Sequence, residues 1–225
     1  MDAIVTLLNG PVQPWDALIC TSQAVKQTIE TVLQAQVNYY QDRLAVGRLV
    51  LPQLPVIPLG LHTQEFNFTE AQKAHARQSL GLEHDSIVVL FLGRLSFHAK
   101  AHPYPMYRAL QRAVEKLLQA KKLRAGQVIL LEAGWHANDY LRQAFDEAAE
   151  SVCPSVALRR LDAREASQRQ IAWAAADVFC SFSDNLQETF GLTPIEAMAS
   201  GLPSLVSDWN GYKDTVRHER DGYRI

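Results

Sequence analysis

From Ser86 onward the chain alternates short apolar runs with amphipathic stretches. Runs that are rich in Val, Ile, Leu and Phe are typical of strands buried on both faces of a parallel sheet. They cover residues 87–92, 128–131, 156–161, 178–182 and 202–207, and a last extended segment begins at 223. The spacing of apolar positions between them predicts helices over 106–122, 138–151, 167–176 and 193–200. This repeated order predicts an α/β fold with a doubly wound parallel sheet.

The chain before Gly60 follows a different pattern. A short strand is predicted over 17–21, a helix that Ser22 can cap follows it, and three prolines keep 51–58 extended. We therefore place a domain border near 58–60, so that residues 1–58 and 59–225 form two parts. The first part is too short for an independent α/β domain and is predicted to be the tail of an incomplete domain with its linker. The second part is expected to be truncated at its C-terminus, which would make the chain a fragment.

Composition and charge narrow the class of protein. With 48% hydrophobic and 20% charged residues, the chain is neither collagen-like, nor a coiled coil, nor fully disordered. A net charge of −2 gives no sign of nucleic-acid binding. No apolar run approaches the ~20 residues of a membrane span, and the N-terminus lacks the basic start of a signal peptide. We expect a cytoplasmic protein, and the three scattered cysteines predict neither a disulfide framework nor a zinc site.

Residues 181–208 carry the clearest indication of chemistry. They predict a strand end, a loop and a helix start, and this is the edge of a parallel sheet where ligands bind. The free amides of Gly191, Leu192 and Thr193, together with the helix dipole, would form a phosphate site. Glu188 and Glu196 bracket these amides and suit the hydroxyls of a sugar or a ribose.

A structural interpretation of the same residues stays open. The tetrapeptide 193–196 (TPIE) also fits a capping box, with Thr193 as N-cap and Glu196 at the third helical position. Glu196 would then secure only its own helix, and Glu188 would be an ordinary acid of a surface loop.

A second polar loop follows the predicted strand at 87–92. Arg94 offers a planar fork of donors and Lys100 a mobile ammonium group, and both suit a diphosphate. The loops after separate strands converge on one rim of a doubly wound sheet, so these cations are expected near the amides. The alternative is two solvated basic residues. His98 and His102 have the spacing of a metal pair, but no carboxylate or cysteine is near them in sequence, and we expect no metal site.

Together these segments resemble glycosyltransferase family 4, the retaining group 1 glycosyltransferases of GT-B fold. The resemblance rests on Gly93-Arg94-Leu95 with Lys100, and on residues 188–203 (ETFGLTPIEAMASGLP), where seven residues separate the two glutamates. It covers about residues 50–225 well and 15–40 loosely. It implies a Rossmann-like C-terminal half of a GT-B fold, which binds the donor, preceded by a remnant of the acceptor-side domain.

The resemblance also implies a function and roles for individual residues. The enzyme would bind a nucleotide-diphosphate sugar and transfer the sugar, with retention, to an acceptor that the sequence does not identify. Family members usually need neither a metal nor another cofactor at the site, and preorganised cations and amides can stabilise the departing diphosphate. The matching residues are Arg94 and Lys100 for the diphosphate, Phe190, Gly191, Leu192 and Thr193 for the phosphate loop, Glu188 for sugar and phosphate, Glu196 for the ribose, and Leu161 and Asp162 for the base.

Departures from the family pattern leave alternatives open. His62 stands where the family commonly has an acid, and the glycine-rich loop and histidine of the first domain are absent, so this chain alone is expected to bind nucleotide weakly and not to turn over. Another GT-B enzyme, such as a phosphorylase or a sugar-nucleotide epimerase, or a non-catalytic scaffold domain would have the same fold. Arg108, Arg112 and Lys116 form either a solvated helix face or a peripheral contact with the inner membrane surface. The base, the sugar and the oligomeric state do not follow from the sequence.

Overall fold

The computed structural model describes residues 2–225, which form two compact units, one ending at Gly60 and the other spanning Leu61–Ile225. The first unit contains α1 (Asp2–Leu7) and α2 (Gln23–Leu44). The elements of the second unit are η1 (Thr63–Phe66), α3 (Glu70–Ser79), β1 (Ile87–Leu92), α4 (Pro103–Gln119), β2 (Val128–Gly134), α5 (Asp139–Val152), β3 (Ala157–Asp162), α6 (Ala166–Ala175), β4 (Val178–Ser181), α7 (Leu192–Ala199), β5 (Ser204–Val206), α8 (Tyr212–Thr215) and β6 (Gly222–Arg224).

The second unit is built on a six-stranded parallel sheet in the order β3-β2-β1-β4-β5-β6. The chain first adds strands on one side of β1 and then, from β4 onward, on the other. This reversal creates a crevice beyond the carboxyl ends of β1 and β4. The predicted doubly wound α/β fold is therefore confirmed.

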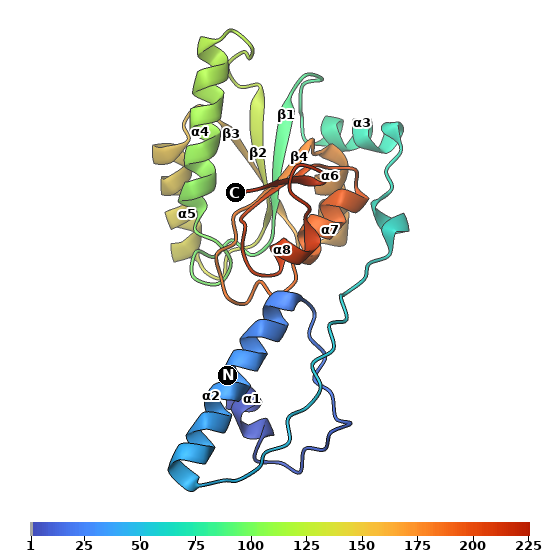
Figure 1. Ribbon diagram of the computed structural model, residues 1–225. Helices are drawn as coiled ribbons and strands as arrows, with labels where there is room; N and C mark the ends of the chain where they lie inside the picture. The colour runs from blue at the N-terminus through green and yellow to red at the C-terminus, as the bar shows by residue number, and fades with distance from the viewer. Residues whose placement is uncertain (1) are drawn as a thin grey trace. The chain divides into compact units, whose positions relative to one another are not determined.

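Helices cover both faces of the sheet, with α4 and α5 on one face and α3, α6 and α7 on the other (Figure 1). Successive residues of β1 point to opposite faces: Val89 and Phe91 pack in the cluster with α4 and α5, while Leu90 packs in the cluster with α6 and α7. Both faces of β1 are buried, which explains why this strand is an unbroken apolar run.

A charged residue lies inside the layer between the sheet and α4. The Glu132 side chain on β2 is fully buried, and it accepts hydrogen bonds from the Tyr107 hydroxyl and, at 2.9 Å, from Arg160 Nε. Burial raises the pKa of Glu132, and these two partners oppose the shift. A buried carboxylate with donors on both oxygens is a structural feature, because removing either partner would leave a desolvated polar group.

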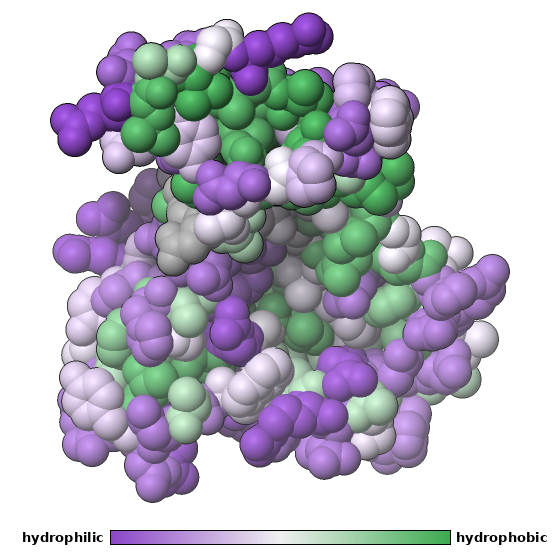
Figure 2. Space-filling model, turned by 90° about the horizontal axis from the view of Figure 1, so that it is seen from below, coloured by the Kyte–Doolittle hydropathy of each residue, from purple (hydrophilic) through white to green (hydrophobic). Residues whose placement is uncertain are grey.

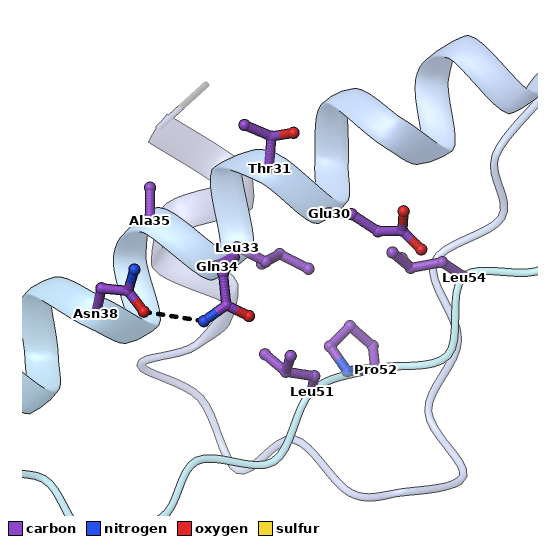
Figure 3. Close-up of a pocket in the computed structure, with 9 residues that line it drawn as sticks. All are labelled: Glu30, Thr31, Leu33, Gln34, Ala35, Asn38, Leu51, Pro52 and Leu54. Carbon is purple, nitrogen blue, oxygen red and sulfur yellow. Dashed lines mark hydrogen bonds between the residues drawn. The ribbon is translucent and has the colours of Figure 1, made fainter.

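In the first unit, α2 packs Ile29, Leu33 and Val37 against Cys20. The strand predicted over 17–21 is reduced to two parallel bridges, Ala17 to Gln53 and Cys20 to Val56. A groove of about 670 Å³ runs between α2 and residues 51–54, with leucine side chains at its floor and polar ones along the helix (Figure 3).

Large hydrophobic side chains remain exposed in this unit. Trp15 is 74% exposed, Ile19 58% and Ile57 52%. Groups of hydrophobic residues among hydrophilic ones are visible on the face shown in Figure 2. Because parallel strands are normally covered on both faces, the bridged segments present an unusually bare surface. Within residues 2–225, none of the helices has the length and apolar character needed to cross a bilayer.

Candidate functional site

Four of the residues singled out from the sequence line one cavity beyond the carboxyl ends of β1 and β4. Arg94 and Lys100 lie in the loop after β1, and Glu188 and Thr193 follow β4. The cavity has a volume of about 220 Å³, and Gly93, Ser183, Asn185 and Gln187 complete much of its lining. It lies at the reversal point of the sheet, where open α/β sheets bind ligands.

Lys100 and Glu188 form an ion pair inside this cavity. Their side chains are only 15% and 11% exposed. Hydrogen bonds to their backbone carbonyls hold both residues of the pair in place. The Ser183 hydroxyl donates to the Lys100 carbonyl at 3.0 Å, and the Gly211 amide donates to the Glu188 carbonyl at 3.1 Å. The ammonium group that suits a diphosphate is therefore already in contact with a carboxylate of the chain itself.

Arg94 differs from Lys100 because its side chain is exposed and forms no ion pair with a carboxylate of residues 2–225. Its guanidinium donates to the Ala99 carbonyl at 3.3 Å, which bends it over its own loop. A guanidinium has about five N–H donors. At least three of those on Arg94 therefore remain available to an anion. Arg94 is thus the cation of the cavity that can receive a ligand without first losing an internal salt bridge.

The N-terminus of α7 faces the same region. Gly191 is the N-cap residue, has φ 81° in the left-handed region, and no side chain caps the helix. The amides of Leu192 and Thr193 belong to the first turn and have no intrahelical acceptor. The capping-box interpretation is wrong, because the helix begins at Leu192 and Thr193 lies inside it. Phe190, just before the turn, is buried and anchors it.

Glu196 lies on α7 but outside the lining of the cavity. It follows Leu192 by four residues, roughly 6 Å along the helix axis. Its half-buried carboxylate makes no hydrogen bond or ion pair within residues 2–225. Burial raises the pKa of Glu196, and Arg169 opposes the shift. An unpaired, half-buried carboxylate is suited to binding hydroxyl groups.

Leu161 and Asp162 line a separate recess of about 350 Å³ at the ends of β2 and β3. Leu95 lines this recess too, so it adjoins the loop that carries Arg94. The Arg164 guanidinium, which donates to Asp162 at 2.9 Å, holds the pKa of that carboxyl at about 2. The structure therefore brings Arg94, Lys100, Glu188 and Thr193 together, and leaves the residues expected at the base in a neighbouring recess.

Sequence analysis missed Tyr212. This side chain is fully buried, and its hydroxyl lies 2.9 Å from the Ser181 hydroxyl at the end of β4. Its ring occupies the space beneath Gly191, where an added Cβ would overlap the ring. Nothing in the local sequence marks this tyrosine, because only the fold brings it under the phosphate loop.

Metal-ligating side chains do not cluster in the part of the chain that the structure describes. There, no three His, Cys, Asp or Glu side chains lie close enough together to hold an ion.

Comparisons with known proteins agree on one family. A family model described as "Glycosyl transferases group 1" matches residues 72–225. A D-inositol 3-phosphate glycosyltransferase of Thermobispora bispora is 35% identical over 162 residues, covering 70% of this chain and 36% of the relative. An uncharacterized glycosyltransferase of Methanocaldococcus jannaschii is 28% identical over 176 residues, covering 76% of this chain and 40% of the relative.

Solved structures share the fold. Anabaena HepE in complex with UDP and glucose superimposes with a TM-score of 0.67 at 18% identity, covering 100% of this chain and 53% of the HepE chain. The chain thus spans well under half the length of the two curated relatives and about half of the solved one.

Proposed function

The chain belongs to the group 1 glycosyltransferases, and from this premise we propose that it is the donor-binding part of a retaining enzyme of glycosyltransferase family 4. It binds a nucleotide-diphosphate sugar, and the complete protein transfers the sugar to an acceptor. One observation chiefly supports this proposal. A single cavity at the reversal point of the sheet is lined by Arg94, Lys100, Glu188 and the first turn of α7.

The geometry suits the stabilisation of a departing diphosphate. Transfer of the sugar leaves negative charge on the diphosphate, and fixed donors around that charge lower the barrier. Arg94 and Lys100 would approach the phosphates from the β1 side, and the amides of Leu192 and Thr193 from the α7 side. Glu188 would turn to the sugar hydroxyls once the diphosphate takes Lys100. No metal and no further cofactor has a role in this scheme.

The first unit is proposed to be part of the acceptor-side domain, with the border near residues 58–60. Two observations support this: the bare face of the bridged segments around Ile19 and Ile57, and relatives that are more than twice as long as the matched region. A chain without a complete acceptor site is expected to bind donor and not to turn over.

A peripheral membrane contact and a cytoplasmic location stay predictions. Arg108, Arg112 and Lys116 lie exposed along α4 and form no ion pair within residues 2–225. The neighbouring helix α5 also exposes two acids, Glu147 and Glu150, which opposes attraction to an anionic surface.

Titration calorimetry of the 225-residue chain with UDP, GDP and ADP tests the proposed function. We expect one of these nucleotides to bind selectively, because the recess at Leu161 and Asp162 would contact the base next to the phosphate cavity. A scaffold that kept the fold without its ligand would bind none of them, and that result would contradict the proposal.

Glu196 is expected to recognise the ribose, and Glu196→Gln tests this role. In the native chain the nucleoside diphosphate should bind about tenfold more tightly than its 2′-deoxy analogue, since a hydroxyl bonded to a carboxylate contributes roughly 1.5–3 kcal/mol. In Glu196→Gln most of this preference should disappear.

The same preference is expected to depend on pH. Burial raises the pKa of Glu196 above the ordinary value of about 4.3, so on acidification the carboxylate is protonated earlier than an exposed glutamate. The preference for ribose should be complete at neutral pH and decline in the acidic range, and it should be flat in Glu196→Gln. Taking the ratio of the two nucleotides cancels the titration of the phosphates. If the ratio of the two affinities is unchanged in the variant, Glu196 does not contact the ribose.

A further inference from the structure

The Tyr212 side chain contacts three parts of the proposed donor site at once. Its hydroxyl lies 2.9 Å from Ser181 Oγ, and the Glu188 carboxylate is near enough to raise the pKa of that hydroxyl. Its ring lies beneath Gly191, where any Cβ would collide with ring carbons. One buried side chain therefore connects the end of β4, the acid of the cavity and the turn that opens α7.

Close backbone packing around Tyr212 holds these groups in place. The Gly211 amide donates to the Glu188 carbonyl at 3.1 Å, and a Cβ at 211 would overlap the backbone at Phe190. The 188–190 loop thus rests directly on residues 211–212. Burial and the nearby Glu188 carboxylate raise the pKa of Tyr212, so the hydroxyl keeps its proton and remains a hydrogen-bond donor.

We propose that Tyr212 is a positioning residue of the donor site: its hydroxyl aims the Glu188 carboxylate into the cavity, and its ring supports the left-handed turn at Gly191 that presents the α7 amides. Tyr212 does not contact the donor itself and acts through Glu188 and Gly191. This inference rests on the proposed function and adds a residue that the Arg94, Lys100 and two-glutamate pattern does not include.

A second buried tyrosine provides a matched control. Tyr107 is also fully buried, and its hydroxyl donates to the Glu132 carboxylate on β2. Neither Tyr107 nor Glu132 lines the cavity of Arg94 and Lys100. Loss of either hydroxyl leaves a buried partner short of one hydrogen bond, so Tyr107→Phe and Tyr212→Phe should both lower the thermal stability modestly.

The test compares binding of a nucleotide sugar with binding of the corresponding free diphosphate, using UDP-glucose with UDP, GDP-mannose with GDP and ADP-glucose with ADP. Glu188 is proposed to contact the sugar, so the ratio of the two affinities reports its orientation. We expect Tyr212→Phe to reduce this ratio about tenfold, the effect of misplacing one hydrogen bond to a charged group. The free diphosphate should keep its affinity, because the phenylalanine ring still supports the Gly191 turn.

A double-mutant cycle separates positioning from general destabilisation. In a Glu188→Gln background the additional change Tyr212→Phe should have no effect on the ratio, because the two residues act as one unit. Tyr107→Phe should leave the ratio unchanged while lowering the unfolding temperature. A ratio that stays native in Tyr212→Phe, or an equal loss in both backgrounds, would overturn the inference alone. A native chain that binds neither member of any pair would overturn the proposed function, and the inference with it.

Discussion

Replacing Arg94 and Lys100 together by alanine is expected to weaken nucleoside diphosphate binding by at least about 100-fold, since each hydrogen-bonded charge contributes roughly 1.5–3 kcal/mol. Both side chains line the cavity beyond β1 and β4, and the α7 amides alone would hold the phosphates weakly. Titration calorimetry against the native chain, with the nucleotide that binds best, measures the loss.

The two single variants are expected to differ in stability. Arg94 is exposed and forms no ion pair with any carboxylate that the structure describes, so Arg94→Ala should leave the unfolding temperature near that of the native chain. Lys100→Ala leaves the buried Glu188 carboxylate without its partner and should destabilise the fold. Arg112→Ala, which removes an exposed cation from α4, is the matched control and should change neither property. Binding that survives the double change would show that the diphosphate lies elsewhere.

Glu188→Gln is expected to bind the free nucleoside diphosphate more tightly than the native chain, by about tenfold. The native carboxylate is paired with the Lys100 ammonium and repels the incoming phosphates, so the ligand must displace the carboxylate from Lys100. Glutamine has a similar size and removes the charge, which lifts this competition. The expected gain corresponds to about 1.4 kcal/mol, a modest value for a half-desolvated ion pair.

The direction of this effect distinguishes two roles of Glu188. An acid that only contacts ligand hydroxyls would leave free diphosphate binding unchanged when neutralised, and a carboxylate that braces the loop would weaken it. Asp184→Asn controls for the general gain in positive potential, because Asp184 lies exposed in the same loop and forms no ion pair with Lys100. An equal gain in Asp184→Asn and Glu188→Gln would refute direct competition for Lys100.

The sheet could be predicted from the sequence because its central strands are buried on both faces. An unbroken apolar run such as Ile87–Leu92 has few alternatives to a central strand, and β1 has these same bounds. At the sheet edge the signal weakens, since β3 includes Arg159 and Arg160 and begins one residue later than predicted. Helix α3 was not predicted, although Thr69 and Gln72 form a capping box at its start. Few of its residues are buried, so its sequence lacks a clear apolar periodicity.

The candidate site could be predicted only as far as local sequence determines it. The loops carrying Arg94 and Glu188 follow strands, and the topology of the sheet brings them together. The contact between Lys100 and Glu188 joins residues far apart in sequence, so no local pattern indicates it. The capping box at Thr193 failed for a related reason: Gly191 in the left-handed region, with the Tyr212 ring beneath it, starts the helix earlier than the side-chain pattern indicates.

The most direct test of the proposed donor site is a crystal structure of this chain with the nucleoside diphosphate that it binds best. We expect the phosphates in the cavity after β1 and β4, within hydrogen-bonding distance of Arg94, Lys100 and the amides of Leu192 and Thr193, with Glu188 released from Lys100. Phosphates bound away from this cavity, with the ion pair between Lys100 and Glu188 intact, would contradict it.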